Sequence, residues 1–138
     1  MTEDLDAAWD PFIQAVLAKK AAHVVALDVS ALTSIADLFI ICSGRSNRQV
    51  AAIAEHIERQ LRKRKIKPLS VEGTTEGHWV LMDYGHVIIH VFFEPVRAFY
   101  DLEGLWSDAR RIPIPAALHP KSTPGGKTRR PGSEDEEA

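Results

Sequence analysis

The chain has 138 residues, a length that fits a single domain with a buried core. Hydrophobic residues make up 45% of the sequence, which excludes an intrinsically disordered protein. Lys and Arg number 17 and Asp and Glu 19, so the net charge of −2 excludes a general attraction to nucleic acid or anionic lipid.

The sequence also indicates a compartment. A single cysteine, Cys42, excludes an intramolecular disulfide and fits a reducing environment. The acidic N-terminus lacks the basic and apolar regions of a signal peptide, and no window approaches the roughly 20 apolar residues that span a bilayer. We therefore expect a cytoplasmic protein with no membrane partner.

The first half of the chain predicts two helices and two strands. Asp10 and Pro11 form a typical helix start, and an apolar stripe continues to about residue 22. Strands are expected at 23–29 and 37–42, and the second is apolar throughout, which is typical of a central strand. Ser46 and Gln49 match an S-x-x-Q capping box that opens a helix running to about residue 64.

The second half predicts three strands and a helix. A short strand at 68–72 precedes a hairpin, whose strands at 79–83 and 86–93 are joined by a tight turn at Tyr84 and Gly85. Pro95 starts a last helix that ends near residue 106. The order α-β-β-α-β-β-β-α predicts an α+β fold, a mixed sheet with helices packed on it. We expect residues 1–107 to form this domain and residues 108–138, rich in proline and mixed charge, to form a disordered tail.

Catalytic and metal-binding patterns are weak in this sequence. His86 and His90 lie four residues apart on one expected strand, a separation of about 13 Å that one metal ion cannot bridge. Cys42 lies in an apolar run, and no serine has the G-x-S-x-G setting of an exposed nucleophile. We expect no cofactor and no enzymatic activity.

Two alternatives to a simple binding protein remain open. A strand that ends in Ser43-Gly44 and leads into a helix resembles the phosphate-binding turn of metal-dependent nucleotidyltransferases, but no paired acids follow it. The basic run at 59–67 indicates an RNA-binding assembly factor or a secondary RNA contact, although cations at a helix C-terminus are usually only solvated.

Aromatic residues between 79 and 106 carry the strongest functional signal. Trp79 begins a strand and Tyr84 occupies a turn, where burial is unusual, so we interpret both as contacts for a partner. Tyr100 on the last helix is a third candidate. The expected core aromatics are Phe92, Phe93 and Phe99.

The sequence from Phe12 to Trp106 resembles the ribosomal silencing factor family, also called RsfS or Iojap-like. The resemblance rests on ALDVSALTSIADLFIICSGRSNRQVAAIAEHI, on VEG at 71–73, on HWVLMDYGHVIIHVF and on FYDLEGLW, in that order. It implies a nucleotidyltransferase-like topology without the activity. It also implies a homodimer that binds the large ribosomal subunit through its L-fourteen protein, blocks the small subunit and represses translation in starvation or stationary phase.

Carried onto this sequence, the resemblance implies a contact surface on the hairpin and the last helix. Its residues are Trp79, Met82, Tyr84, Gly85, His86, Arg97, Tyr100 and Asp101. His86 departs from the family, which often has an acid there. The tail after residue 112 lies outside the resemblance.

Overall fold

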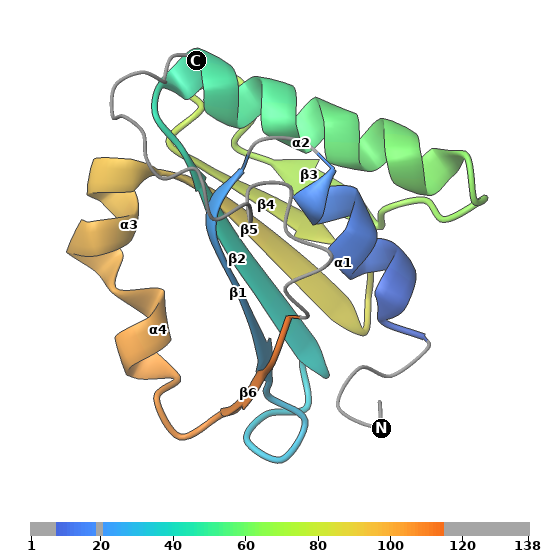
Figure 1. The fold of residues 1–138 in the computed structure, drawn as a ribbon, viewed down its shortest axis with the longest axis vertical. Coiled ribbons are helices and arrows are strands. Elements are labelled where there is room, and N and C mark those ends of the chain that lie inside the picture. The colour runs from blue at the N-terminus through green and yellow to red at the C-terminus, as the bar shows by residue number, and fades with distance from the viewer. Residues whose placement is uncertain (1–7, 19–20, 115–138) are drawn as a thin grey trace, which may run out of the picture.

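The computed structural model describes residues 8–18 and 21–114, so the predicted tail from 115 onward lies outside the described residues. These ranges contain four helices and six strands (Figure 1). In chain order they are α1 Asp10–Leu17, β1 Ala22–Asp28, β2 Leu38–Gly44, α2 Asn47–Arg62, β3 Ser70–Glu72, β4 Trp79–Asp83, β5 Val87–Phe93, α3 Glu94–Tyr100, α4 Leu102–Leu105 and β6 Arg110–Ile112.

The six strands form one mixed sheet in the order β3-β4-β5-β2-β1-β6. Only β2 and β5 run parallel, with Ile40 opposite Ile89, and the other neighbours are antiparallel. Every residue of β2 is buried, which confirms the prediction of a central strand. The sheet and its helices confirm the predicted α+β class, whereas the nucleotidyltransferase-like topology stays a prediction.

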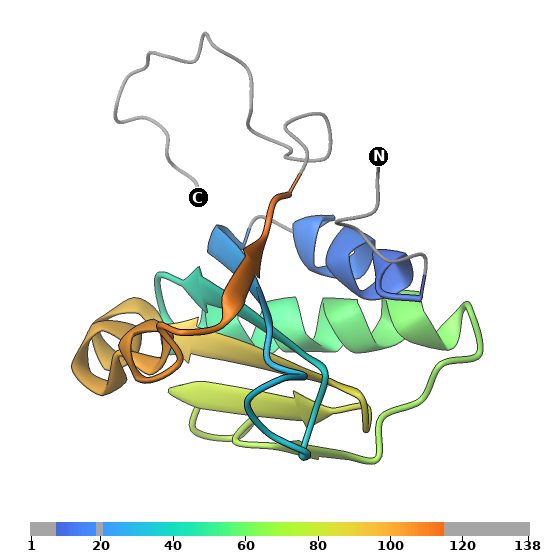
Figure 2. The same ribbon diagram turned by 90° about the horizontal axis from the view of Figure 1, so that it is seen from below.

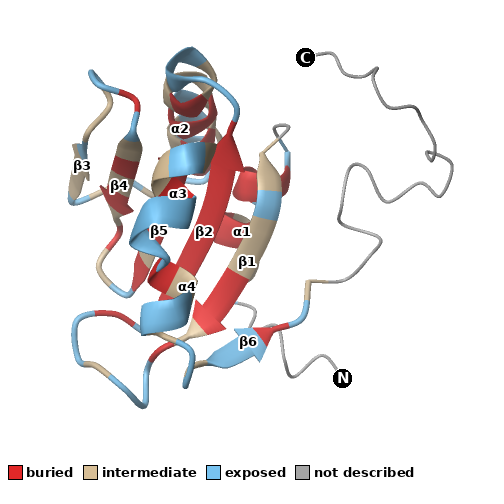
Figure 3. Cartoon of the chain, turned by 90° about the vertical axis from the view of Figure 1, so that its left-hand side faces the viewer, coloured by how far each residue is buried: buried red, intermediate tan, exposed pale blue. Residues whose placement is uncertain are grey.

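The two faces of the sheet are covered unequally. Helices α1 and α2 lie together on one face (Figure 2), and their Ile13, Val16, Ile53 and Ile57 are fully buried there. The short helices α3 and α4 cover part of the other face, where a smaller cluster includes Leu102. Figure 3 shows that α3 and α4 are largely exposed on their outer sides. None of the helices in the described ranges is both long and apolar enough to cross a membrane.

The start of α2 confirms Ser46 as the predicted N-cap, but the return bond of the capping box is shifted by one residue, to Arg45. The backbone N–H of Gln49 donates to Ser46 Oγ at 3.0 Å, and the Gln49 side-chain oxygen accepts from the backbone N–H of Arg45. The helix ends at Arg62, two residues before the predicted end, and Lys65 then takes a positive φ of 64°. A left-handed residue cannot continue a right-handed helix, so the chain turns here.

The predicted last helix is wrong as a single element. Asp101 has a φ of 48°, which ends α3, and its carboxylate accepts a hydrogen bond from the backbone N–H of Gly104 at 3.2 Å, which caps α4. Aspartate tolerates the left-handed conformation better than most residues because its short polar side chain can bond locally. One side chain therefore ends one helix and begins the next.

Strand β6 lies in residues that the sequence assigned to the tail. Ile112 pairs with Ala26 of β1, and Arg110 forms an ion pair with Asp28 at 3.2 Å. Partial burial alone would raise the pKa of Asp28, but hydrogen bonds from Ser30 and Arg110 outweigh it and lower this pKa. The sheet therefore includes residues past the predicted domain boundary at 107. A three-residue strand before a proline has too little periodicity to be recognised from the sequence.

The burial of Tyr84 predicts that its side chain contributes to the stability of the fold. Its ring is 7% exposed and meets Phe12 of α1 edge to face at 5.3 Å, while its hydroxyl is buried without a hydrogen-bond partner. We expect Tyr84→Ala to lower the free energy of unfolding by about 3 kcal/mol, measured by denaturant titration. Tyr84→Phe is the control and should be neutral or slightly stabilising, because it removes an unsatisfied hydroxyl. Wild-type stability of Tyr84→Ala would contradict the burial.

Candidate partner-binding surface

Trp79 and Tyr100 lie side by side, as contact residues of one surface would. Trp79 begins β4 and Tyr100 ends α3, and their ring centroids are 5.1 Å apart. The indole also stacks on Phe92 of β5 at 4.8 Å, which supports it from the sheet side. Tyr100 is 49% exposed and Trp79 is half-buried, so both rings reach the surface from a rigid base.

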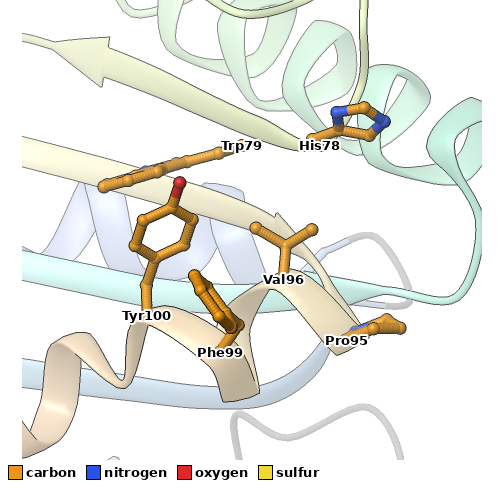
Figure 4. A pocket seen from close by; sticks show the side chains of 6 residues that line it. All are labelled: His78, Trp79, Pro95, Val96, Phe99 and Tyr100. Carbon is orange, nitrogen blue, oxygen red and sulfur yellow. The ribbon is translucent and has the colours of Figure 1, made fainter.

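These two rings line an open apolar cavity of about 360 Å³, shown in Figure 4. We call it the aromatic cleft and define it by its lining residues, His78, Trp79, Pro95, Val96, Phe99 and Tyr100. Its walls come from the start of β4, with the residue before it, and from α3. Phe99 is 81% exposed and meets Tyr100 edge to face at 5.2 Å.

Phe99 is therefore not a core residue, and its predicted role was wrong. Helix α3 is only seven residues long and lies beside the sheet, where it packs inward through Val96 and Arg97. Phe99 projects from the same helix toward the cleft instead. The other two core predictions fare better, since Phe92 is fully buried and Phe93 is partly buried against the larger core.

Met82 and Tyr84 were predicted at the contact surface, and the structure contradicts both. Successive side chains of a strand point to opposite faces, so residues 79 and 82 cannot share one. Trp79 faces α3, whereas Met82 faces α1 and α2 and is fully buried. Tyr84 lies on that same covered side. A turn residue can be buried when a helix covers it, and the sequence did not show that α1 does so here.

Arg97 was also predicted as a contact residue, but its guanidinium is used inside the molecule. It pairs with both carboxylate oxygens of Glu103, Nε with Oε1 at 3.1 Å and Nη2 with Oε2 at 2.8 Å. Nη1 donates to the Ser43 hydroxyl at 2.7 Å. These hydrogen bonds are the main reason that the pKa of Glu103 lies below its ordinary value. Arg97 thus joins α3 to α4 and to the end of β2, and it is buried.

Gly85 and His86 lie at the tip of the hairpin, away from the aromatic cleft. Six residues of extended chain separate Gly85 from Trp79, which is about 20 Å. Gly85 has a φ of 94° and donates its N–H to Asp83 at 2.8 Å, so glycine serves the turn itself. His86 is exposed and meets Phe12 edge to face. Of the eight predicted residues, only Trp79, Tyr100 and Asp101 lie together and exposed or half-exposed.

The Ser43-Gly44 turn does not form an open phosphate site. The Ser43 side chain is fully buried and already accepts from Arg97, and a Cβ added at Gly44 would lie 3.1 Å from Val50. Cys42 is buried as well, and burial raises the pKa of its thiol to about 12. Within residues 8–18 and 21–114, no three His, Cys, Asp or Glu side chains are grouped to hold a metal ion.

Comparison with known proteins decides the family. The family model "Ribosomal silencing factor during starvation" matches residues 2–138. The ribosomal silencing factor RsfS of Halalkalibacterium halodurans is 41% identical over 106 residues, which cover 77% of this chain and 91% of that protein. The Bacillus subtilis protein of the same name is 44% identical over 91 residues, covering 66% of this chain and 77% of that one. The chain belongs to the ribosomal silencing factor family.

The structure agrees with that assignment. A crystal structure of a protein from Chromobacterium violaceum superposes with a TM-score of 0.69 at 38% identity, covering 71% of this chain and 82% of that one. The family match and the named relatives confirm the resemblance to ribosomal silencing factors that the sequence motifs indicated.

Sequence reasoning missed four of the six residues that line the cleft in this silencing factor. His78, Pro95, Val96 and Phe99 were not named as contacts, although all four line it. Positions 96, 99 and 100 have the i, i+3, i+4 spacing of one helix face, which was the available signal. That spacing alone does not say whether the face meets the sheet or the solvent.

The ion pair of Arg97 and Glu103 generates a second prediction. Glu103→Gln leaves a buried guanidinium without its counter-charge, so we expect a loss of about 2 kcal/mol in unfolding free energy at pH 7. The pKa of Glu103 is lower in the folded chain, so its stabilising effect is complete above the ordinary value of 4.5 and is lost as pH falls through the lowered pKa. Unfolding titrations of both proteins from pH 7 to 3 should therefore converge at the acidic end.

Glu58→Gln is the matched control for that experiment. Glu58 pairs with Arg62 across one turn of α2, where the arginine is half exposed. Exposed pairs of this kind contribute about 0.5 kcal/mol or less. Equal losses from the two variants would show that the Arg97 pair does not hold the two short helices in place.

Proposed function

We propose that this protein binds the large ribosomal subunit through the aromatic cleft and thereby blocks association with the small subunit. The observation that supports this most is the cleft itself, an apolar cavity of about 360 Å³ bordered by exposed Phe99 and Tyr100. No described element of the chain covers it. The family name supports the ribosome as the target, because relatives of similar length are ribosomal silencing factors.

The chemistry of the cleft suits a protein partner. Trp and Tyr are common interface anchors because they supply a large apolar area with a polar edge and lose little conformational entropy. The cleft has a volume of about 360 Å³, enough for an apolar side chain, and exposed Asp101 follows Tyr100 in the chain and adds negative charge nearby. Such a site fits a basic protein with a projecting apolar residue. We propose the large-subunit protein L-fourteen as this partner.

The proposed mode of action is steric and non-catalytic. A protein held at the joining face of the large subunit would prevent the small subunit from binding there, and translation would fall in starvation or stationary phase. We further propose that the protein acts in the cytoplasm and forms a homodimer.

A secondary contact with ribosomal RNA is part of the proposal. The basic turn, which we define as residues 59–67, carries six exposed cations, Arg59, Arg62, Lys63, Arg64, Lys65 and Lys67. Both views place the end of α2 on the opposite side of the molecule from α3 and α4 (Figures 1 and 2). A partner in the cleft would therefore leave this turn open to nearby phosphates.

The cleft can be tested directly. Phe99→Ala and Tyr100→Ala should each weaken binding to purified large subunits at least about tenfold in sedimentation, and should restore subunit joining to the same degree. Ile35→Ala is the matched control, since Ile35 is equally apolar and 62% exposed but lies in the loop between β1 and β2. Wild-type binding by both cleft variants would refute the proposed surface.

The basic turn calls for a separate test. Charge reversal at Lys63 and Arg64 should weaken large-subunit binding only a few-fold at low salt, and the difference should disappear at high salt because the contact is electrostatic. The measurement is an affinity series over increasing potassium chloride. Complete loss of binding would favour an RNA-binding assembly factor over a protein-anchored silencing factor.

A further inference from the structure

His90 is a buried titratable residue that the proposed binding surface does not use. It lies on β5 with only 4% of its surface exposed. Its ring sits among Phe39, Phe92 and Trp79, with centroid distances of 4.9, 6.3 and 5.9 Å. It lines no part of the aromatic cleft, and it has no contact with solvent that would explain a polar side chain here.

The imidazole has one hydrogen bond, and that bond goes to a wall of the cleft. Trp79 Nε1 donates to His90 Nδ1 at 3.1 Å. An indole nitrogen can only donate, so His90 Nδ1 carries no proton. In the neutral ring the proton therefore lies on Nε2, which is buried and has no hydrogen-bond partner. The edge-to-face arrangement with Phe39 offers only the weak contact of an aromatic ring.

A buried histidine with an unpaired nitrogen lowers the stability of the fold, so its presence at this position calls for a reason. A buried polar group without full hydrogen bonding destabilises the fold, and an apolar side chain of similar size would fill the space. Burial lowers the pKa of His90 to about 4, so the ring is neutral and its Nδ1 can accept at neutral pH. What the histidine adds over an apolar residue is a fixed acceptor for the indole.

We propose that His90 is a positioning residue that holds the Trp79 indole in place as a wall of the aromatic cleft. Without the acceptor, the half-buried indole N–H would lose its partner and would favour a rotamer that turns toward water. Tyr100 packs against that indole, so the opposite wall would lose its support as well. This inference rests on the proposed function for its effect on partner affinity, but not for its effect on Trp79.

Two variants separate the acceptor from the packing. His90→Leu fills much of the space but cannot accept a hydrogen bond, whereas Asn at this position places its amide oxygen close to where Nδ1 lies. In the His90→Leu protein we expect the Trp79 indole proton to exchange faster with solvent, and its nuclear magnetic resonance signal to shift. Affinity for purified large subunits should fall about tenfold. His90→Asn should restore protection of the indole proton and most of the affinity.

Three measurements test the role of His90, and two of them do not depend on affinity for large subunits. Imidazole nitrogen shifts of the wild-type protein report the tautomer without any variant, and a protonated Nδ1 at neutral pH would overturn the proposal. An unchanged Trp79 signal in His90→Leu would overturn it too. If His90 acts through the indole, adding His90→Leu to Trp79→Phe should cost no further affinity, whereas additive losses would indicate a packing role. Failure of the wild-type protein to bind large subunits would refute the proposed function alone, since the indole readout needs no partner.

Discussion

The paired hydrogen bonds between Arg97 and Glu103 are the interaction on which the exposed half of the molecule depends. Helices α3 and α4 have seven and four residues, too few to be stable in isolation. They are joined to each other by this carboxylate–guanidinium pair and to the sheet by the bond from Arg97 to Ser43. The aromatic cleft exists because these contacts hold Phe99 and Tyr100 opposite Trp79.

The two faces of the sheet serve different purposes. The face under α1 and α2 is a closed apolar core in which Tyr84 and Met82 are buried. The face toward α3 is held partly by polar contacts, and it leaves aromatic rings at the surface. Rigid support from the closed face allows the other face to keep aromatic rings exposed at little cost to the stability of the fold.

Sequence patterns predicted the fold well because hydrophobic period and capping chemistry are local. The N-cap at Ser46, the all-apolar β2 and the hairpin were all found this way. Predictions failed where tertiary context decided the outcome. Whether Tyr84 in a turn is buried depends on the position of α1, and whether Arg97 meets a partner depends on Glu103, which lies beyond a helix break. Strand alternation could have separated Met82 from Trp79, but the family resemblance grouped them.

The pairing of β6 with β1 changes one edge of the sheet. A sheet edge with free N–H and C=O groups is a template for pairing with another chain. Here β6 covers the end of β1, and its own outer edge is three residues long and carries two arginines. So short an edge offers few backbone groups for pairing with a second copy. The segment after the cleft helices therefore protects the end of β1 from edge-to-edge pairing.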